Sequence, residues 1–481
     1  MPNPGPTAKN PVTELDYSVI QQCMHCGLCL PTCPTYVETG RERSSPRGRI
    51  ALARAVADGE LDVTREFAEE MDYCVGCLAC QTACPAGVEY VSILEASRAA
   101  SEEKGLLNTP SRSVYRWLGL RLLMTRPRLL RTVARAVAVQ QKPAVRRAMY
   151  RLGVMRLAPP ALRRLEPQAP PIDPPFSDER IREVERPPAD WWPAEPRARV
   201  AVLTGCVQDI SFARVNRATV DVLLAAGCEV HTPRRQSCCG SLHAHNGDLA
   251  AAREMARRTL DPFRPGGVCS LDRLDAVISN SGGCGSHLRH YGDLLGDDPV
   301  YGPVAHEWDR KLRDVQEYVW GLVGNTARAA DEPRSRLERV LQVAAGPHPS
   351  AGADGPEPPP ATDRERLTYD ASCHLCHGQK VVSQPVELLR RLPGYDFVPL
   401  AESDWCCGAA GVYTITQPEQ AAKLLERKLT HLRAARPHVV ATANPGCMHQ
   451  LNLACRGDDS LAHTRVAHPM ELLAEACHAS D

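Results

Sequence analysis

The sequence predicts a multidomain α+β protein, with an N-terminal α-helical module rich in cysteine followed by two tandem α/β cysteine-rich repeats. Three observations predict this fold class. Two cysteine groups with identical spacing lie within residues 21–88, two later parts of the chain show the same order of β-rich and helical runs, and proline-rich stretches separate these parts. The 481 residues, 43% of them hydrophobic, are enough to fill several cores.

Composition narrows the setting of the protein. Lys plus Arg and Asp plus Glu each total 57, so the formal net charge is zero and does not favour nucleic-acid binding. The N-terminal "MPNPGPTAKNPVTELDYS" lacks the apolar core of a secretory signal, and no apolar run approaches the roughly 18 residues that cross a bilayer. We therefore expect a cytoplasmic protein.

Twenty-one cysteines in a reducing compartment favour metal ligation over disulfide bonds. Most of these cysteines form regular clusters, whereas buried free thiols that act as small hydrophobic residues would be scattered along the sequence. We expect that simpler role for four isolated positions. These are Cys228, Cys269, Cys455 and Cys477.

The stretches "CMHCGLCLPTC" and "CVGCLACQTAC" repeat one spacing, and each is followed by proline. Three thiolates spaced by two residues can bind three irons of a [4Fe-4S] cubane, while the fourth cysteine of each group reaches the neighbouring cluster. The pattern predicts a ferredoxin-like two-cluster module. Structural zinc sites more often pair two C-x2-C units, so zinc is the weaker alternative. The predicted ligands are Cys23, Cys26, Cys29 and Cys84 for cluster 1, and Cys33, Cys74, Cys77 and Cys80 for cluster 2.

The residues between the two cysteine groups predict two helices. Pro46 and Gly48 lie near the start of the first helix and Gly59 breaks the pattern before the second. We place the end of this α-helical module near residue 105, so that it spans 1–105.

Residues 106–199 are expected to form a basic helical segment and a linker. Fourteen Lys or Arg and no Asp or Glu lie between Leu106 and Leu165, interleaved with apolar residues. Such an amphipathic basic helix could rest on an anionic membrane surface or an acidic partner subunit, or simply present a solvated face over the core. The proline density of 158–197 predicts an extended linker.

Residues 200–343 and 367–481 follow one pattern, separated by a Pro/Gly-rich linker at 344–366. The first part runs "RVAVLTGCV", "EVHTP", "QSCCGSLHAHNGD", "DAVISNSGGCG" and "LRDVQEYVWGLV"; the second runs "RLTYDASCHLCH", "DFVPL", "SDWCCGAAGVY", "HVVATANPGCM" and "RVAHPMELLAEAC". Helical runs alternate with them. This order predicts an α/β unit with a mainly parallel sheet, present twice.

Cysteines fall at matching places in the two repeats. The lone cysteine and the Cys-Cys-Gly motif are separated by 31 and 32 residues, and the motif and the last cysteine by 44 and 39. Loops at the carboxyl ends of parallel strands converge on one rim, where helix N-termini stabilise anionic thiolates. We therefore expect candidate further iron-sulfur ligands there, namely Cys206, Cys238, Cys239 and Cys284, and Cys373, Cys406, Cys407 and Cys447.

The chain has two cysteine groups that each end in Cys-Pro and two Cys-Cys-Gly repeats. In this combination it resembles the iron-sulfur subunits of bacterial glycolate oxidase. The most specific stretches are "CHLCHGQKVVSQPVELLRRLPG", "ESDWCCGAAGVYTITQPEQAAKLLERK" and "VVATANPGCMHQL". The resemblance implies electron transfer from a FAD-binding subunit, which oxidises glycolate to glyoxylate, toward a quinone or another acceptor. The wider family, with subunits of anaerobic glycerol-3-phosphate dehydrogenase and heterodisulfide reductase, keeps related alternatives open, including a lactate-oxidising complex.

One departure from the heterodisulfide reductase pattern concerns the end of each repeat. That family closes each repeat with C-x2-C, whereas Cys284 is followed at this spacing by His287 and Cys447 by Gln450. Whether the repeats hold a further cluster therefore stays open at this point, with His287 and His374 as candidate nitrogen ligands. Cys376 adds a C-x2-C with Cys373 to which we assign no role.

No catalytic residue is predicted. The sequence contains no dinucleotide-binding fingerprint at a strand-to-helix turn, no P-loop and no nucleophile elbow. Removing a hydride from a 2-hydroxy acid requires an organic acceptor such as a flavin, so we expect that chemistry on the partner subunit. Two alternatives remain, a thiol or disulfide reductase acting at the Cys-Cys-Gly sites, and a scaffold whose repeats join subunits.

Overall fold

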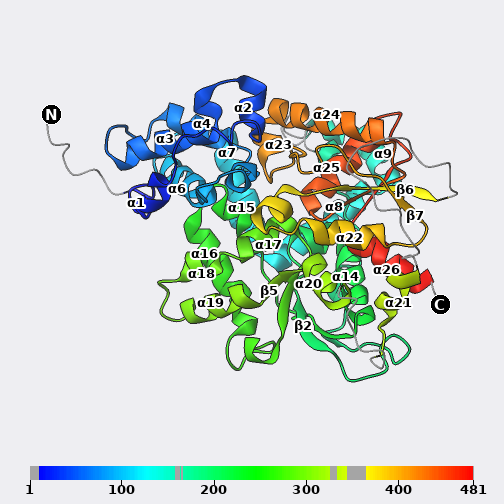
Figure 1. Ribbon diagram of the computed structural model, residues 1–481. Helices are drawn as coiled ribbons and strands as arrows, with labels where there is room; N and C mark the ends of the chain where they lie inside the picture. Colours follow the sequence, from blue (N-terminus) through cyan, green and yellow to red (C-terminus); the bar gives the residue numbers. More distant parts are fainter. Residues whose placement is uncertain (1–9, 158–162, 164–165, 325–332, 344–363, 480–481) are drawn as a thin grey trace.

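The computed structural model describes residues 10–157, 163, 166–324, 333–343 and 364–479. Figure 1 shows three parts, the N-terminal helical module, the first repeat and the second repeat, with the module lying against both repeats. The linker expected at 344–366 falls almost entirely outside the described residues.

The N-terminal module is built from short helices around one core. Ser45 caps α3 through the Gly48 N–H, and Thr64 caps α4 through the Phe67 N–H, which places the two helices where the sequence predicts them. Ile50, Phe67 and Ile93 fill the core between α3, α4 and α6. The helices are α1 (Tyr17–Gln21), α2 (Pro34–Thr39), η1 (Glu42–Ser44), α3 (Pro46–Ala57), α4 (Arg65–Asp72), α5 (Ala79–Thr82) and α6 (Tyr90–Glu103).

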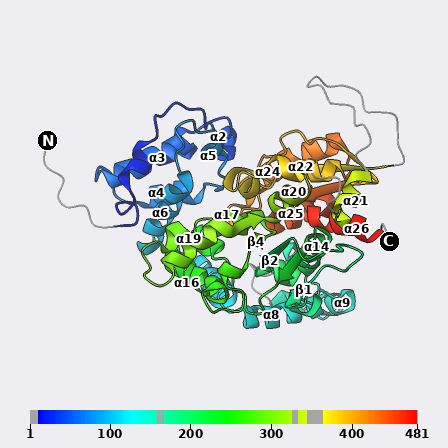
Figure 2. The ribbon, with the colours of Figure 1, turned by 60° about the horizontal axis from the view of Figure 1, so that its bottom comes forward.

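The basic segment is helical, as expected, but several of its arginines form ion pairs with carboxylates elsewhere in the chain. Arg131 pairs with Asp209 at 2.8 Å and with Asp178 at 2.6 Å, and Arg121 pairs with Asp248 at 2.9 Å. Figure 2 shows α8 and α9 along the lower edge of the molecule, next to β1. The helices are α7 (Pro110–Tyr115), η2 (Arg116–Met124), α8 (Pro127–Gln141), α9 (Pro143–Arg151) and α10 (Val154–Leu157).

The described part of the proline-rich stretch differs from the expected free linker. Phe176, Trp191 and Trp192 are buried, because they pack onto the first repeat and its basic helices. The stretch contains η3 (Glu166–Gln168), α12 (Ser177–Arg180) and β1 (Val184–Glu185), which pairs antiparallel with β3 at the sheet edge. The linker expectation is therefore wrong for residues 166–197.

The first repeat is an α/β unit whose sheet has the order β1-β3-β2-β4-β5. All pairings except that of β1 are parallel, as the sequence predicts. The strands are β2 (Ala198–Val202), β3 (Cys228–His231), β4 (Ala276–Ser279) and β5 (Leu312–Asp314). The helices are α13 (Val207–Ser211), α14 (Ala213–Ala225), α15 (Ser241–Ala244), α16 (Leu249–Leu260), η4 (Asp261–Phe263), η5 (Leu271–Arg273), α17 (Gly282–Leu288), α18 (Tyr291–Leu295), α19 (Gly302–Lys311), α20 (Val315–Val323) and α21 (Arg336–Val343).

The second repeat has the order β7-β6-β8-β9, all parallel, which is the first repeat's order without its edge strand. The strands are β6 (Glu365–Asp370), β7 (Tyr395–Phe397), β8 (Val439–Thr442) and β9 (Arg465–Ala467). The helices are η6 (His374–Gly378), α22 (Ser383–Arg390), α23 (Tyr413–Thr416), α24 (Pro418–Ala435), α25 (Pro445–Arg456) and α26 (Pro469–Ala479).

The two repeats share a core and face one another at the carboxyl ends of their strands. The Gly282 N–H donates to the Ala443 carbonyl at 2.9 Å, and the Gly283 N–H donates to Asn444 Oδ1 at 3.0 Å. One cluster of buried residues joins both sheets. Within the described ranges, no helix combines the length and the apolar character needed to cross a bilayer.

Candidate iron-sulfur sites

The cysteines predicted for cluster 1 lie at the surface of the N-terminal module. Cys23, Cys26, Cys29 and Cys84 line one small cavity of about 30 Å³, together with Cys80 of the cluster 2 set. The Cys26 side chain is exposed, and the neighbouring Met24 is 69% exposed. The first cysteine of one group and the last of the other therefore come together, as the exchange of ligands between the two motifs requires.

The cysteines predicted for cluster 2 are more deeply placed. Cys33, Cys74 and Cys77 are buried. Burial raises the pKa of Cys77 well above that of a free thiol, and the nearby charges of Cys406, Cys80 and Cys33 raise it further. Cys33 thus lies beside the second cysteine group although it belongs to the first in sequence.

A buried arginine accompanies the cluster 2 cysteines. Arg49 on α3 donates to Thr35 Oγ1, to the Ser44 carbonyl and to the Glu70 carbonyl at 2.8–3.1 Å. Burial opposes its charge, yet the neighbouring Cys74 and Cys33 raise its pKa. Sequence reasoning did not single out Arg49, because an arginine in a short amphipathic helix usually faces solvent.

In the first repeat, four cysteines come together at the carboxyl ends of β2, β3 and β4. Cys206 directly precedes α13, Cys238 and Cys239 precede α15, and Cys284 lies in the first turn of α17. The Sγ atoms of Cys206 and Cys238 are 3.5 Å apart. Hydrogen bonds from Cys206 and Cys239 lower the pKa of Cys238 well below its ordinary value.

The second repeat brings its four cysteines together in the same way. Cys407 and Cys447 lie with their Sγ atoms 3.2 Å apart, and Cys406 is hydrogen-bonded to Cys373. That hydrogen bond, with the Gly408 N–H at 3.4 Å, lowers the pKa of Cys406 against the opposing effect of burial. We call the four cysteines of each repeat its quartet.

The glycine of each Cys-Cys-Gly motif is required by the backbone. Gly240 and Gly408 have φ angles of 88° and 82°, a region that other residues avoid. A Cβ atom would lie 3.1 Å from the Ala252 carbonyl oxygen in the first repeat and 2.5 Å from the Ala421 carbonyl oxygen in the second. The glycine therefore lets α16 in the first repeat and α24 in the second pack directly against the Cys-Cys-Gly motif.

Both quartets line one chamber of about 290 Å³, which also borders the loop of cluster 2. This loop is held against both repeats. Arg98 donates to the carbonyls of Cys74 and His245 at 2.6 and 2.7 Å, and His374 Nε2 pairs with the Gly76 carbonyl at 2.8 Å. The cluster 2 cysteines and the two quartets are thus neighbours in space.

The other sequence expectations are resolved residue by residue. His374 uses Nε2 on the N-terminal module and also lines the chamber that the quartets share, whereas His287 lies beside a separate outer cavity. The Cys376 thiol donates to the carbonyls of Cys373 and Ala371, outside the chamber. Each of the four isolated cysteines expected to act as a small hydrophobic residue is buried.

The sequence did not indicate a second buried cation either. Lys428 on α24 lies 2.9 Å from Asp370 Oδ1, with neither side chain more than 2% exposed. Its ammonium group donates to the carbonyls of Glu402 and Ser403, and its charge helps to lower the pKa of Cys406. Only tertiary contact reveals this residue, since it sits among charged helix residues in the sequence.

The donor sets fit iron-sulfur clusters. Each set offers four thiols, and backbone N–H groups donate to sulfur in two of them, Gly76 to Cys74 and Gly408 to Cys406, both at 3.4 Å. Such N–H···S bonds and buried cations stabilise the negative charge of a thiolate-bound cluster.

Comparison with known proteins gives the same picture. The profile of the 4Fe-4S dicluster domain matches residues 19–88, and that of the cysteine-rich domain matches 200–289 and 367–452. The probable glycolate oxidase iron-sulfur subunit of Bacillus subtilis is 32% identical over 96% of this chain and 95% of its own length. The glycolate oxidase iron-sulfur subunit of Escherichia coli is 30% identical over 93% and 92%, respectively.

A more distant relative is lactate utilization protein A of Shouchella clausii, 26% identical over 57% of this chain and 98% of its own length. The relationship to the two glycolate oxidase subunits extends through the N-terminal module and both repeats. The chain belongs to the family of glycolate oxidase iron-sulfur subunits.

Proposed function

We propose that this chain is the electron-transfer subunit of a glycolate-oxidising complex and receives electrons from a FAD-binding subunit. The observation that carries the proposal is the continuity of the cysteine sets from surface to interior. The cluster 1 cysteines are exposed or half-buried, three of the four cluster 2 cysteines are buried, and both quartets border the cluster 2 loop. Iron-sulfur clusters held by such sets accept and release single electrons.

The ligand assignment follows from these sets. Cluster 1 takes Cys23, Cys26, Cys29 and Cys84, and cluster 2 takes Cys33, Cys74, Cys77 and Cys80. The presence of two separate quartets favours one additional cluster in each repeat over a single shared one. Four thiolates also satisfy all four irons of a cubane, which leaves no open iron for a thiol or disulfide reductase.

The surface around cluster 1 supports its role as the electron entry point. Met24 and Leu28, in the same loop as the cluster 1 cysteines, are 69% and 58% exposed. Exposed large apolar residues beside a redox centre suit a protein partner. We place the FAD-binding subunit over this loop.

A second surface suits peripheral contact with an anionic membrane. Leu152, directly after α9, and Leu157, the last residue of α10, are 79% and 88% exposed. Among the described residues, Arg147, Arg151 and Arg156 on these helices have no carboxylate partner. Apolar and unpaired basic residues on one short helical segment are typical of interfacial binding.

The test uses the purified chain and the separately purified FAD-binding subunit. Glycolate added to both under anaerobic conditions should bleach the iron-sulfur absorbance of this chain, and glycolate added to the chain alone should leave it unchanged. Lactate and glycerol 3-phosphate serve as the alternative substrates. Bleaching by glycolate without the flavoprotein, or none with it, would refute the proposal.

A further inference from the structure

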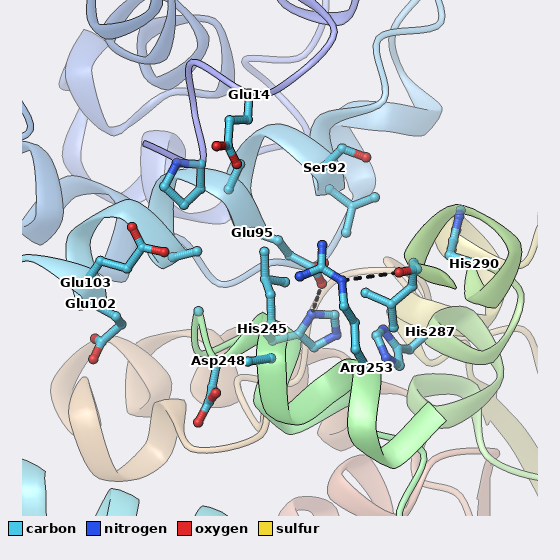
Figure 3. A pocket seen from close by; sticks show the side chains of 18 of the residues that line it. Glu14, Ser92, Glu95, Glu102, Glu103, His245, Asp248, Arg253, His287 and His290 are labelled. Carbon is cyan, nitrogen blue, oxygen red and sulfur yellow. Dashed lines mark hydrogen bonds and ion pairs between the residues drawn. The ribbon is translucent and has the colours of Figure 1, made fainter. Parts of the chain in front are cut away.

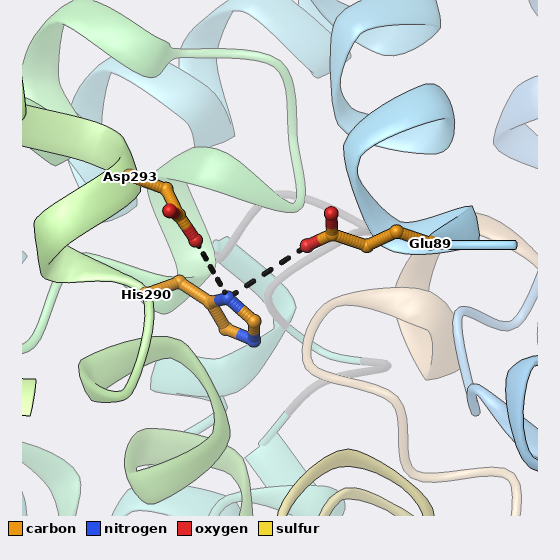
Figure 4. Close-up of side chains that lie close together, drawn as sticks. All are labelled: Glu89, His290 and Asp293. Carbon is orange, nitrogen blue, oxygen red and sulfur yellow. Dashed lines mark hydrogen bonds and ion pairs between the residues drawn. The ribbon is translucent and has the colours of Figure 1, made fainter. Parts of the chain in front are cut away.

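The contact between the N-terminal module and the first repeat surrounds an open outer cavity. Its volume is about 860 Å³, and its walls come from α6, from η2 and from the helices α16 to α18. Figure 3 shows Glu95 of α6 beside His245, and Oε1 of the one lies 2.7 Å from Nδ1 of the other. At the edge of the cavity, Figure 4 shows His290 Nδ1 of the first repeat near Glu89 Oε1 of the module, at 3.8 Å. No cysteine lines this cavity, so polar groups rather than thiols meet across it.

The contact between the module and the second repeat is packed and contains thiols of both parts. Cys77 of the cluster 2 set lies in one buried group with Cys406 and Tyr413, and Cys373 packs against this group. Burial, and after it the charge of Cys406, raises the pKa of Cys77. The packed groups that hold the first repeat's quartet contain no residue of 10–105. Because an electron passes more readily through packed atoms than across open space, this contrast favours the second repeat as the electron acceptor of cluster 2.

One side chain joins the two quartets. Asn444 of the second repeat donates from Nδ2 to Cys447 Sγ at 3.6 Å, and its Oδ1 accepts the Gly283 N–H of the first repeat at 3.0 Å. Gly283 directly precedes Cys284 of the first quartet. Two hydrogen bonds and one peptide unit therefore lead from a thiol of the second quartet to the residue that carries a thiol of the first.

Asn444 makes this contact in place of a local one. It is the N-cap residue of α25, a position where an asparagine side chain usually accepts a hydrogen bond from the first turn of its own helix. Here no such bond forms, and Oδ1 accepts from the first turn of α17 in the other repeat. A Cβ atom at Gly283 would lie 3.1 Å from Asn444 Oδ1, so the glycine permits the close approach. The chain thus gives up a capping bond within α25 for a contact between the repeats.

Buried neighbours hold both ends of this bridge in place. The Gly282 N–H donates to the Ala443 carbonyl at 2.9 Å, and Gln379 Nε2 donates to the Gly282 carbonyl at 3.0 Å. Ala443 and Gln379 are buried. The fold itself therefore fixes the distance between Asn444 and the N-terminus of α17.

We propose that Asn444 is a positioning residue for electron transfer between the quartets, and that electrons pass from cluster 2 to the second repeat and from there to the first repeat. The inference rests on the proposed electron-transfer function. Each transfer moves one electron and no proton. The centre held by the second quartet is oxidised and the centre held by the first is reduced, with the reduced flavin of the partner subunit as the source of the electron.

The two ends of the Asn444 amide have different roles. The Nδ2 N–H stabilises the negative charge on Cys447, and such a bond raises the reduction potential of a thiolate-bound centre. The Oδ1 atom fixes the first turn of α17, which carries Cys284. Loss of a hydrogen bond to a charged group should lower the equilibrium constant for reduction about tenfold, which is about 59 mV for one electron.

The first test is a redox titration of the full-length, iron-loaded chain, followed by electron paramagnetic resonance. Asn444→Asp keeps an oxygen for the Gly283 N–H, and aspartate caps a helix as well as asparagine does, so the fold should be unaffected. Because this variant lacks the N–H donor, the signal that Cys447→Ala removes should shift down by about 59 mV or more, at least tenfold in the equilibrium constant. Asn452→Ala, on the same helix but outside the chamber, is the matched control and should leave every potential unchanged. An unshifted signal in Asn444→Asp would overturn the role of Asn444.

The second test determines the order of reduction by rapid freeze-quench resonance spectroscopy after the chain is mixed with the FAD-binding subunit and glycolate. The signal of the second repeat should appear before that of the first, and Asn444→Ala should delay only the later one. Cys407→Ala should leave the first repeat oxidised, whereas dithionite should still reduce it directly. Appearance of the first-repeat signal before that of the second, or normal reduction of the first repeat in Cys407→Ala, would defeat this inference alone. A parent chain that glycolate and the flavoprotein cannot reduce at all would defeat the proposed function.

Discussion

Replacement of Gly408 by alanine tests whether the Cys-Cys-Gly glycine is needed for backbone geometry. The substitution adds one Cβ atom at φ 82°, and this atom would lie 2.5 Å from the Ala421 carbonyl oxygen. The left-handed conformation alone costs about 1–2 kcal/mol for a non-glycine residue. Displacing a helix carbonyl that cannot swing away adds about 1–3 kcal/mol. We expect a total loss of about 2–5 kcal/mol from the free energy of unfolding.

Two other glycines supply matched controls for this value. Gly394 has a φ of 83° with nothing within 4 Å of the added Cβ, so Gly394→Ala carries only the conformational cost of about 1–2 kcal/mol. In Gly240→Ala the contact is 3.1 Å, and the loss should fall between the other two.

The assay is urea unfolding of the three variants, monitored by circular dichroism, together with the iron content of each purified protein. Gly408→Ala should show the largest loss of stability and should also lose the iron of the second repeat. If Gly408→Ala were no less stable than Gly394→Ala, the close approach of α24 to the thiols could not be the reason for the glycine.

Three further predictions concern single side chains. Cys33→Ala should remove cluster 2 and about four irons while leaving cluster 1, whereas Cys26→Ala should remove cluster 1 and leave cluster 2. Electron paramagnetic resonance distinguishes the two clusters, and loss of cluster 1 in Cys33→Ala would refute the ligand exchange between the two cysteine groups. Arg49→Gln should lower the reduction potential of cluster 2 by roughly 40–130 mV, since a buried neighbouring charge is worth about 1–3 kcal/mol and 1.4 kcal/mol equals about 59 mV for one electron. The exposed Arg43→Gln is the control, and equal shifts of the two variants in a redox titration would contradict the argument. Burial lowers the pKa of His468 to about 3, so below about pH 6.5 the unfolded chain binds a proton that the folded chain does not bind, and stability should fall as the pH drops from about 6.5 toward 3. His468→Gln should flatten this part of the acid-unfolding profile. An unchanged profile would exclude His468 as the source of the pH dependence.

The sequence was sufficient for the parts of the fold that local patterns specify. Short apolar runs such as those at Ala198–Val202 and Val439–Thr442 are strands, and the capped helices α3 and α4 begin where proline and the capping residues indicate. Because the two repeats carry cysteines at equivalent strand ends, the grouping of each quartet also followed from the spacing. The parallel order of each sheet then brought these ends to one rim.

Features that depend on distant contacts could not be predicted. Trp191 and Trp192 lie in a proline-rich stretch and are buried only because the first repeat packs around them. Arg131 belongs to a strongly basic segment, yet its partner Asp209 is 78 residues away. The pairing of His245 with Glu95 joins residues 150 positions apart, so no local pattern indicates the outer cavity.

The central claim is that four cysteine sets in this chain each hold an iron-sulfur cluster. Counting iron and acid-labile sulfide in the anaerobically purified chain tests it most directly. We predict about sixteen irons and sixteen sulfides per chain, from four [4Fe-4S] clusters. About eight irons would show that both quartets are bare, about twelve would show that they share one cluster, and zinc in place of iron would contradict the electron-transfer account altogether.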